Sequence, residues 1–274
     1  RRPGCHPDAG ALRTAAIPAH TRCGIMAGFS GPGPRLPMKN IAPRERLIFA
    51  LDVPDADAAR RMVDTLGDSV VFYKLGLELM MAGGYYELLD WMVGKGKLIF
   101  ADLKFFDIPA TVAAAVRRLN NRGIAFTTVH GNQGIMEAAA GAAKDVKVLA
   151  VTVLTSLDRG DLDDLGFQCD VEQLVVSRAK RALAAGVHGV VSSGIEAEAI
   201  RRELGPRLLV VTPGIRPVEN RAEDDQKRVL TVERAFQLGA DYIVVGRPIR
   251  DAADPRAAAE AIQAQIASVC VRPG

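Results

Sequence analysis

The sequence is poor in the residues that mark several classes of protein. It holds four cysteines in 274 residues, too few and too widely spaced for a disulfide framework, so reduced thiols in a cytoplasmic protein are expected. Its four histidines are equally scattered. Neither residue type has the spacing of zinc ligands, and no metal site is predicted. The sequence also lacks any run of about 18 apolar residues, so no transmembrane helix and no membrane partner are predicted.

Positive charge is in excess only near the beginning of the sequence. The net charge is +3, but residues 1–37 hold five arginines and one aspartate, a balance of +4. The remainder therefore carries −1, and aromatic residues make up only 5% of the chain. A nearly neutral body with few aromatic side chains lacks the basic surface of a nucleic-acid-binding protein. No nucleic-acid partner is predicted.

Residues 1–37 differ in composition from the rest of the chain. They are rich in glycine, proline and arginine and follow neither helical nor strand periodicity, which predicts a disordered N-terminal extension. Because the sequence begins at Arg1 and becomes regular only after Met38, we interpret this stretch as an upstream or expression-derived segment. A transit peptide would also be rich in arginine and poor in acids, but proline and glycine disfavour its amphipathic helix. Residues 38–274 are predicted to form a single domain.

From residue 47 onward the chain alternates strand-like and helix-like segments. Eight short runs rich in β-branched and aliphatic residues predict strands over 47–52, 70–75, 98–104, 125–130, 146–154, 189–192, 208–213 and 241–246. Between them, apolar residues at three- and four-residue spacings predict helices, among them 56–66, 111–121, 171–185 and 257–269. The repeat is about 28 residues per strand–helix unit. This spacing favours an α/β fold of the (β/α)8 TIM-barrel type.

An open, doubly wound sheet uses the same alternation and is the competing fold. It would be favoured by a glycine-rich phosphate-binding turn after the first strand. That position reads Leu-Asp-Val-Pro at residues 51–54, without the G-x-G-x-x-G pattern. The barrel is therefore the preferred architecture.

Charged residues stand at the ends of the first three predicted strands. In a barrel the active site lies at the carboxyl ends of the strands. The first strand ends in Asp52, the second contains Lys74, and the third ends in Asp102 and Lys104. One such charge inside an apolar run would be explained equally well by a structural ion pair. Three successive strands with charges at the same end predict a site.

The later strands end in residues suited to a neutral polar group, after the fifth strand, and to a phosphate, after the seventh and eighth. Thr155 follows the fifth strand, and Arg216 follows the seventh in the string Thr-Pro-Gly-Ile-Arg. The eighth strand ends in Gly246 and Arg247, in a region where barrels commonly bind phosphate. A turn glycine and a solvated surface arginine would explain this last pair about equally well.

These strings together resemble the orotidine 5'-phosphate decarboxylase family. The resemblance spans roughly residues 45–260. It rests on Asp-x-Lys-x-x-Asp-Ile-Pro-x-Thr at 102–111, Leu-Asp at 51–52, the Lys74 strand, Leu-Thr-Ser at 154–156, Thr-Pro-Gly-Ile-Arg at 212–216 and Val-Gly-Arg at 245–247.

The resemblance implies a carboxy-lyase of pyrimidine biosynthesis. It would convert orotidine 5'-phosphate to UMP and CO2 without a metal or organic cofactor. A protonated Lys104 would stabilise the carbanion at C6 of the pyrimidine and then protonate it. Asp102 and Asp107 would keep this lysine charged, and Lys74 would complete an array of alternating charges.

The resemblance also assigns residues to the rest of the substrate and to a homodimer. Asp107, with Ile108 and Thr111, would reach into the partner's site, so that each active site is shared. A plain role at the start of a helix would equally suit an aspartate just before Ile-Pro. The substrate contacts implied are a ribose hydroxyl for Asp52, the pyrimidine for Thr155, and the phosphate or its loop for Arg216, Gln226, Gly246 and Arg247.

Two other functions fit parts of the same pattern. Sugar-phosphate decarboxylases and synthases of the same superfamily share the Asp-x-Lys-x-x-Asp string and act with Mg2+. They usually follow its second aspartate with small residues, whereas Ile108 and Pro109 stand here. A non-catalytic phosphate-binding barrel is the other possibility. The presence of all four charged residues argues against it: Lys74, Asp102, Lys104 and Asp107.

Overall fold

A computed structural model of the protein describes residues 39–216 and 230–270. The predictions about residues 1–37 and about Gln226 therefore lie outside the described residues. The extent of a single domain over residues 38–274 likewise stays a prediction. None of the helices in the described ranges is both long enough and apolar enough to cross a membrane.

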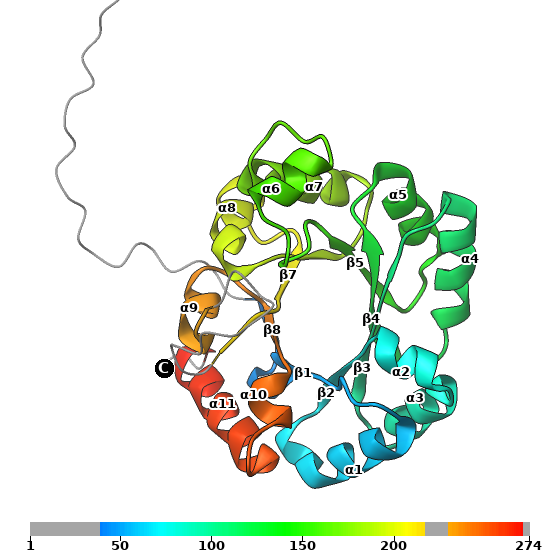
Figure 1. Ribbon diagram of the computed structural model, residues 1–274, viewed down its shortest axis with the longest axis vertical. Coiled ribbons are helices and arrows are strands. Elements are labelled where there is room, and N and C mark those ends of the chain that lie inside the picture. Colours follow the sequence, from blue (N-terminus) through cyan, green and yellow to red (C-terminus); the bar gives the residue numbers. More distant parts are fainter. Residues whose placement is uncertain (1–38, 217–229, 271–274) are drawn as a thin grey trace, which may run out of the picture. The chain divides into compact units, whose positions relative to one another are not determined.

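Eight parallel strands close into a barrel in which each strand pairs with the next and the last pairs with the first (Figure 1). They are β1 (Leu47–Ala50), β2 (Phe72–Leu75), β3 (Leu98–Phe105), β4 (Ile124–His130), β5 (Lys147–Val151), β6 (Gly189–Val191), β7 (Leu209–Thr212) and β8 (Tyr242–Val245). The predicted (β/α)8 barrel is confirmed. Its fifth strand is shorter than predicted, because residues 152–154 lie beyond the end of β5.

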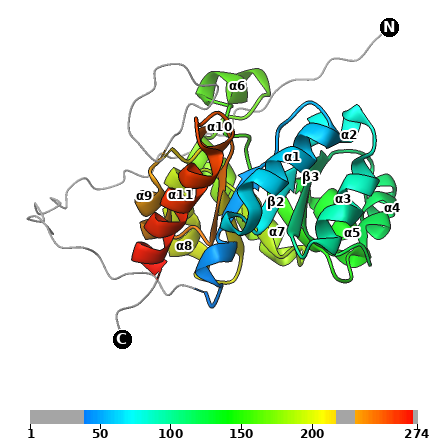
Figure 2. The ribbon, with the colours of Figure 1, turned by 90° about the horizontal axis from the view of Figure 1, so that it is seen from below.

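Helices surround the barrel and connect its strands (Figure 1). The α-helices of the described part are α1 (Ala56–Leu66), α2 (Leu77–Ala82), α3 (Tyr85–Gly94), α4 (Pro109–Leu119), α5 (Gln133–Ala142), α6 (Arg159–Asp164), α7 (Val171–Ala184), α8 (Gly194–Leu204), α9 (Val232–Gln237), α10 (Arg247–Arg250) and α11 (Pro255–Cys270). Two short 3-10 helices, η1 (Pro43–Glu45) and η2 (Gly67–Ser69), accompany them. In the side view, α6 and α10 lie at the same end of the barrel (Figure 2).

Local sequence signals set where several helices begin. The Asp55 side chain accepts a hydrogen bond from the amide of Ala58 at 2.7 Å and caps α1, and Asp170 caps α7 in the same way. Such caps satisfy amides that have no partner within the helix. The helix α4 begins at Pro109, two residues before the predicted start, because proline suits the first helical position.

The interior of the barrel is filled by alternate side chains of the strands. Its apolar members are Ile48, Ala50, Phe72, Phe100, Phe126, Leu149, Val211, Tyr242 and Val244. Inward-facing side chains recur every second residue in a strand. Along the first four strands and their continuations, the residue two positions after such an apolar side chain is polar: Asp52, Lys74, Asp102 and Thr128. On the side of the first four strands, an apolar layer therefore lies directly beneath a row of polar groups.

A buried ion cluster lies at the opposite end of the barrel, between the strands and helix α8. Asp241, just before β8, binds Arg201 at 2.7 Å and Lys39 at 2.6 Å through one carboxylate oxygen. The same oxygen accepts a hydrogen bond from the amide of Val210 at 3.0 Å. The side chains of Arg201 and Asp241 are only 6% and 5% exposed, so each charge depends on the other for compensation. The cluster joins β8, α8 and the residues before β1.

Candidate active site

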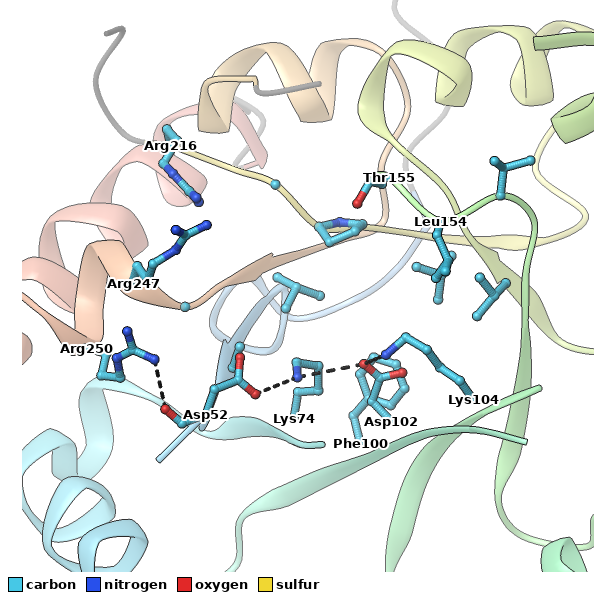
Figure 3. A pocket seen from close by; sticks show the side chains of 18 residues that line it. Asp52, Lys74, Phe100, Asp102, Lys104, Leu154, Thr155, Arg216, Arg247 and Arg250 are labelled. Carbon is cyan, nitrogen blue, oxygen red and sulfur yellow. Dashed lines mark hydrogen bonds and ion pairs between the residues drawn. The ribbon is translucent and has the colours of Figure 1, made fainter. Parts of the chain in front are cut away.

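A cavity of about 480 Å³ opens at the carboxyl ends of the strands (Figure 3). Most of its walls come from the ends of the strands and the segments directly after them. It is lined by Ala50, Asp52, Lys74, Phe100, Asp102, Lys104, Val151, Val153, Leu154, Thr155, Val191, Pro213, Gly214, Arg216, Val244, Gly246, Arg247 and Arg250. Eight of the residues singled out from the sequence are among them.

Four charges of alternating sign form a chain along one side of the cavity (Figure 3). The Nζ atom of Lys74 lies 3.0 Å from Oδ1 of Asp52 and 3.7 Å from Oδ2 of Asp102. The Nζ atom of Lys104 lies 2.7 Å from the same Oδ2. Lys74 thus lies between two carboxylates, and Asp102 lies between two ammonium groups. Lys104 is at the end of the chain, with a side chain that is 33% exposed.

Asp102 is the most deeply buried member of this chain of charges, with a side chain only 10% exposed. Burial alone would raise the pKa of Asp102. The positive charges of Lys74 and Lys104, together with hydrogen bonds from Lys104 and Thr128, outweigh burial and hold the pKa below its ordinary value of 3.8. Asp102 is therefore a buried carboxylate at neutral pH.

The strand that carries Asp102 and Lys104 is irregular at this point. Ala101 pairs with Thr127 and Phe105 pairs with Val129, so residues 102–104 lie opposite the single residue Thr128. Lys104 adopts a φ of +47°, in the left-handed region that costs a residue with a side chain roughly 1 kcal/mol. Simple strand alternation predicted the side on which Asp102 and Lys104 lie, but it gave no sign of this bulge.

Two arginines line the part of the cavity that is formed by residues after β7 and β8. Arg247 begins α10 directly after Gly246, and Arg216 follows β7 (Figure 3). Burial lowers the pKa of Arg216 from its ordinary value, although the guanidinium stays charged because that value is 12.5. Thr155, after β5, also lines the cavity. The cavity therefore combines a chain of alternating charges with a cationic wall.

Sequence reasoning missed Arg250, which also lines the cavity. Its Nη1 donates a hydrogen bond to the backbone carbonyl of Asp52 at 2.9 Å, and its Nε lies 2.6 Å from Oδ1 of Asp251. Arg250 lies one helical turn after Gly246, on the face that turns toward β1. Only the short helix α10 puts it there, and no helix was predicted from the sequence over residues 247–250.

Three residues predicted for the site do not line this cavity. Asp107 is exposed, and its Oδ1 accepts a hydrogen bond from the amide of Ile108 at 2.6 Å. Ile108 is 66% exposed, and Thr111 is exposed on the first turn of α4. Within residues 39–216 and 230–270, no group of three or more histidine, cysteine, aspartate or glutamate side chains is placed to hold a metal ion.

Comparison with known proteins relates this site to a family. The model of the orotidine 5'-phosphate decarboxylase / HUMPS family matches residues 45–262, which include every described residue of the cavity. The chain belongs to this family. The resemblance stated from the sequence motifs is confirmed.

Two relatives named for this enzyme each match more than four fifths of the chain. An orotidine 5'-phosphate decarboxylase of Methylococcus capsulatus is 63% identical over 231 residues, which are 84% of this chain and 96% of that protein. One of Xanthomonas campestris pv. campestris is 52% identical over 241 residues, which are 87% of this chain and 98% of that protein.

A solved structure from the family has the same fold. The crystal structure of orotidine 5'-phosphate decarboxylase from Lactobacillus acidophilus superposes with a TM-score of 0.72 at 34% sequence identity. The match covers 81% of this chain and 99% of that one.

Proposed function

We propose that the protein is a cytoplasmic, cofactor-independent decarboxylase that converts orotidine 5'-phosphate to UMP and CO2 in pyrimidine biosynthesis. Relatives that share 63% and 52% of their residues with this chain bear the name of that enzyme. The observation that carries the proposal is the content of one cavity. Asp52, Lys74, Asp102 and Lys104 alternate in charge along one side, and Arg216 and Arg247 line another.

The chemical difficulty is the charge that decarboxylation leaves behind. When the bond between C6 and the carboxyl carbon breaks, its electron pair stays on C6 in an orbital that the pyrimidine ring cannot delocalise. Lys104, the exposed end of the chain of charges, would place its ammonium group at C6 and stabilise this carbanion electrostatically. One Nζ proton then moves to C6 and gives UMP, and the neutral amine takes up a proton from solvent.

The other charges would prepare Lys104 for this step. Asp102, 2.7 Å from Nζ of Lys104, favours the protonated amine. Its charge would also lie beside the substrate carboxylate, a repulsion that disappears as CO2 leaves. Lys74, between Asp52 and Asp102, would balance the two carboxylates, so that the buried charge of Asp102 is compensated.

The remaining cavity residues would hold the substrate. Asp52 would bind a ribose hydroxyl and Thr155 the pyrimidine. Arg247, the backbone amide of Gly246 and Arg216 would bind the dianionic phosphate, because guanidinium groups pair with its oxygens through two hydrogen bonds at once. Gln226 remains a prediction for the same phosphate.

We further propose a homodimer with shared active sites. Asp107, Ile108 and Thr111 do not line the cavity of their own chain and are exposed. Phe106 and Ile108, on either side of Asp107, are each 66% exposed. Exposed apolar side chains of this size favour an interface. In the dimer, Asp107 would enter the partner's cavity and supply a further carboxylate to its chain of charges.

The decarboxylation is tested by following the absorbance of orotidine 5'-phosphate in metal-free buffer. We expect turnover with the wild-type protein and no loss of activity after treatment with EDTA. Turnover that requires Mg2+, or activity on a ketose phosphate in its place, would contradict the proposal in favour of the sugar-phosphate branch of the family.

The shared site is tested by mixing two inactive variants. Asp107→Ala and Lys104→Ala chains each lose activity alone, but a mixed dimer holds one cavity with both residues intact. Activity is therefore expected to return after subunit exchange. The absence of any return, once exchange has been verified by mass spectrometry, would contradict the shared site.

A further inference from the structure

Thr128 is the one uncharged member of the row of polar groups above the apolar layer of the barrel interior. It lies in β4, is completely buried and is opposite Leu149 of β5. Its side chain lies on the same side of β4 as Phe126, which belongs to the barrel interior. The preceding residue, Thr127, hydrogen-bonds instead to the backbone carbonyl of Ala101 at 3.0 Å. The two adjacent threonines therefore have different surroundings.

The hydroxyl of Thr128 contacts two residues of the charge chain at once. It donates a hydrogen bond to Oδ1 of Asp102 at 2.8 Å and accepts one from the backbone amide of Lys104 at 3.0 Å. A hydroxyl has one proton to give and lone pairs to accept with, so both bonds are compatible. The hydroxyl proton is donated to the carboxylate of Asp102, and one lone pair of the hydroxyl oxygen accepts the backbone amide of Lys104.

Each of these two bonds has a consequence for the geometry of the site. With Oδ1 of Asp102 held by Thr128, Oδ2 is the oxygen that meets Nζ of Lys104 and Nζ of Lys74. The bond to the amide of Lys104 falls where β3 bulges and φ is +47°. Backbone in that region persists only when neighbouring groups hold it. Thr128 supplies such a group at the centre of the bulge.

We propose that Thr128 is a positioning residue of the active site, whose hydroxyl fixes the carboxylate of Asp102 and the backbone of Lys104 relative to each other. This inference rests on the proposed decarboxylation. Without the hydroxyl, Oδ1 of Asp102 and the amide of Lys104 both lose a buried partner. The carboxylate then turns, and the ammonium group of Lys104 moves away from the reacting carbon.

The test compares three substitutions that keep the fold of β4. Thr128→Val preserves the shape of the side chain and removes the hydroxyl, whereas Thr128→Ser keeps the hydroxyl. Thr127→Val removes a buried hydroxyl that has no contact with the charges and is the matched control. We expect Thr128→Val to lower kcat roughly 10- to 100-fold, as for a lost hydrogen bond to a charged group. KM should change less than about threefold, and the other two variants should stay near wild type.

A pH profile separates positioning from a purely structural role. Removing the hydrogen bond from Thr128 raises the pKa of Asp102, because that bond is one of the interactions that lower it. The acidic limb of kcat/KM is therefore expected to move to higher pH in Thr128→Val and to return in Thr128→Ser. An unchanged kcat and profile in Thr128→Val, or an equal loss in Thr127→Val, would overturn the inference.

Crystal structures of the variants give a readout that does not depend on activity. We expect the Asp102 carboxylate of Thr128→Val to be rotated and its contact with Nζ of Lys104 to be lost. Side chains that superpose on those of the wild type would overturn the inference.

If Thr128→Val does not fold, Thr128→Cys, with a weak sulfur donor of similar size, replaces it in all three measurements. Absence of wild-type turnover would contradict the proposed function, whereas the crystal structures test Thr128 in either case.

Discussion

Asp102 is the residue on which the charges of the site meet. One of its carboxylate oxygens contacts both Lys74 and Lys104, and the other accepts the hydroxyl of Thr128. Burial of a carboxylate is costly unless such partners compensate it. These contacts tie the stability of the fold to the protonation of a residue of the proposed active site.

The stability that Asp102 contributes should depend on pH. Its pKa in the folded protein lies below the ordinary value of 3.8, so the folded state binds this proton less readily than the unfolded state does. The stabilisation is therefore fully present above pH 3.8 and is lost as the pH falls through the lowered pKa. We expect the difference in the free energy of unfolding between wild type and Asp102→Asn to be constant near neutral pH and to shrink below pH 3.8.

Urea unfolding at several pH values, followed by circular dichroism, measures this difference. Asp57→Asn is the control, because the side chain of Asp57 is 77% exposed and its substitution should cost little at any pH. A difference for Asp102→Asn that stays constant through the acidic range would contradict the role of the buried carboxylate.

Arg250 should act on substrate binding through Asp52. Its guanidinium holds the backbone carbonyl of Asp52, and removal of such a bond weakens the placement of the carboxylate proposed for the ribose. Arg250→Ala is expected to raise KM for orotidine 5'-phosphate roughly 10-fold, with kcat within about twofold of wild type. Arg256→Ala, which removes an arginine paired with Glu260 on α11, is the control. Equal kinetics for the two variants would contradict the prediction.

At the residue scale, charge was the signal that made a site predictable. Asp52, Lys74, Asp102 and Lys104 each interrupt an apolar run, and period-two alternation puts them on the side of the barrel interior. Thr128 does not stand out in its strand in this way, because threonine is common in β-strands. Arg250 belongs to the cavity only through the short helix α10. Neither could be found without the three-dimensional contacts.

Among the elements, β6 has little room beside it at Gly189. A Cβ atom added at Gly189 would lie 2.6 Å from the Cβ atom of Leu209 in β7 and 2.9 Å from a side-chain carbon of Leu149 in β5. The glycine thus allows β6 to lie between its two neighbours. Its φ is not in the left-handed region, so the reason for the glycine is space and not backbone conformation.

Gly189→Ala is expected to destabilise the protein by about 2 kcal/mol, the range for an overpacked core. Gly141→Ala in α5 is the matched control, because nothing lies within 4 Å of the Cβ that it would add. That variant should be stabilised by up to about 1 kcal/mol, since alanine favours a helix over glycine. Thermal and urea unfolding measure both. Equal stabilities of the two variants would contradict the packing argument.

At the element scale, the order of strands was predictable and their details were not. Alternating apolar runs and amphipathic segments located all eight strands. The end of β5 was placed three residues too late, because Val153 and Leu154 continue the β-branched and aliphatic pattern of the strand. The bulge in β3 was missed because a left-handed lysine has no sequence signature, unlike a left-handed glycine.

The two ends of the whole barrel carry different groups of charged residues. At the carboxyl ends of the strands, charges are grouped around a cavity. At the amino ends, Asp241, Arg201 and Lys39 form a buried cluster that joins distant parts of the chain. Barrels commonly divide function and stability in this way. The second cluster went unnoticed in the sequence, because its members are far apart along the chain.

Asp241→Asn should therefore lower stability and leave catalysis intact. The variant leaves the buried Arg201 without its counter-ion, which costs about 3 kcal/mol. Asp64→Asn, which removes a pair with Lys95 between side chains that are 58% and 43% exposed, should cost less than about 1 kcal/mol. Urea unfolding measures both losses, and kcat at a temperature where both variants are folded should equal that of wild type. A fall in kcat for Asp241→Asn would contradict the division between the two ends.

The central claim is that Lys104 performs the proton transfer of a decarboxylation that needs no metal. It is tested most directly by the rate of conversion of orotidine 5'-phosphate to UMP in metal-free buffer, with wild type and Lys104→Ala measured side by side. We expect rapid turnover by wild type and a loss of at least about 10³-fold in Lys104→Ala, with the fold of the variant verified by circular dichroism. Turnover by a folded Lys104→Ala variant at a rate close to that of wild type would contradict this claim.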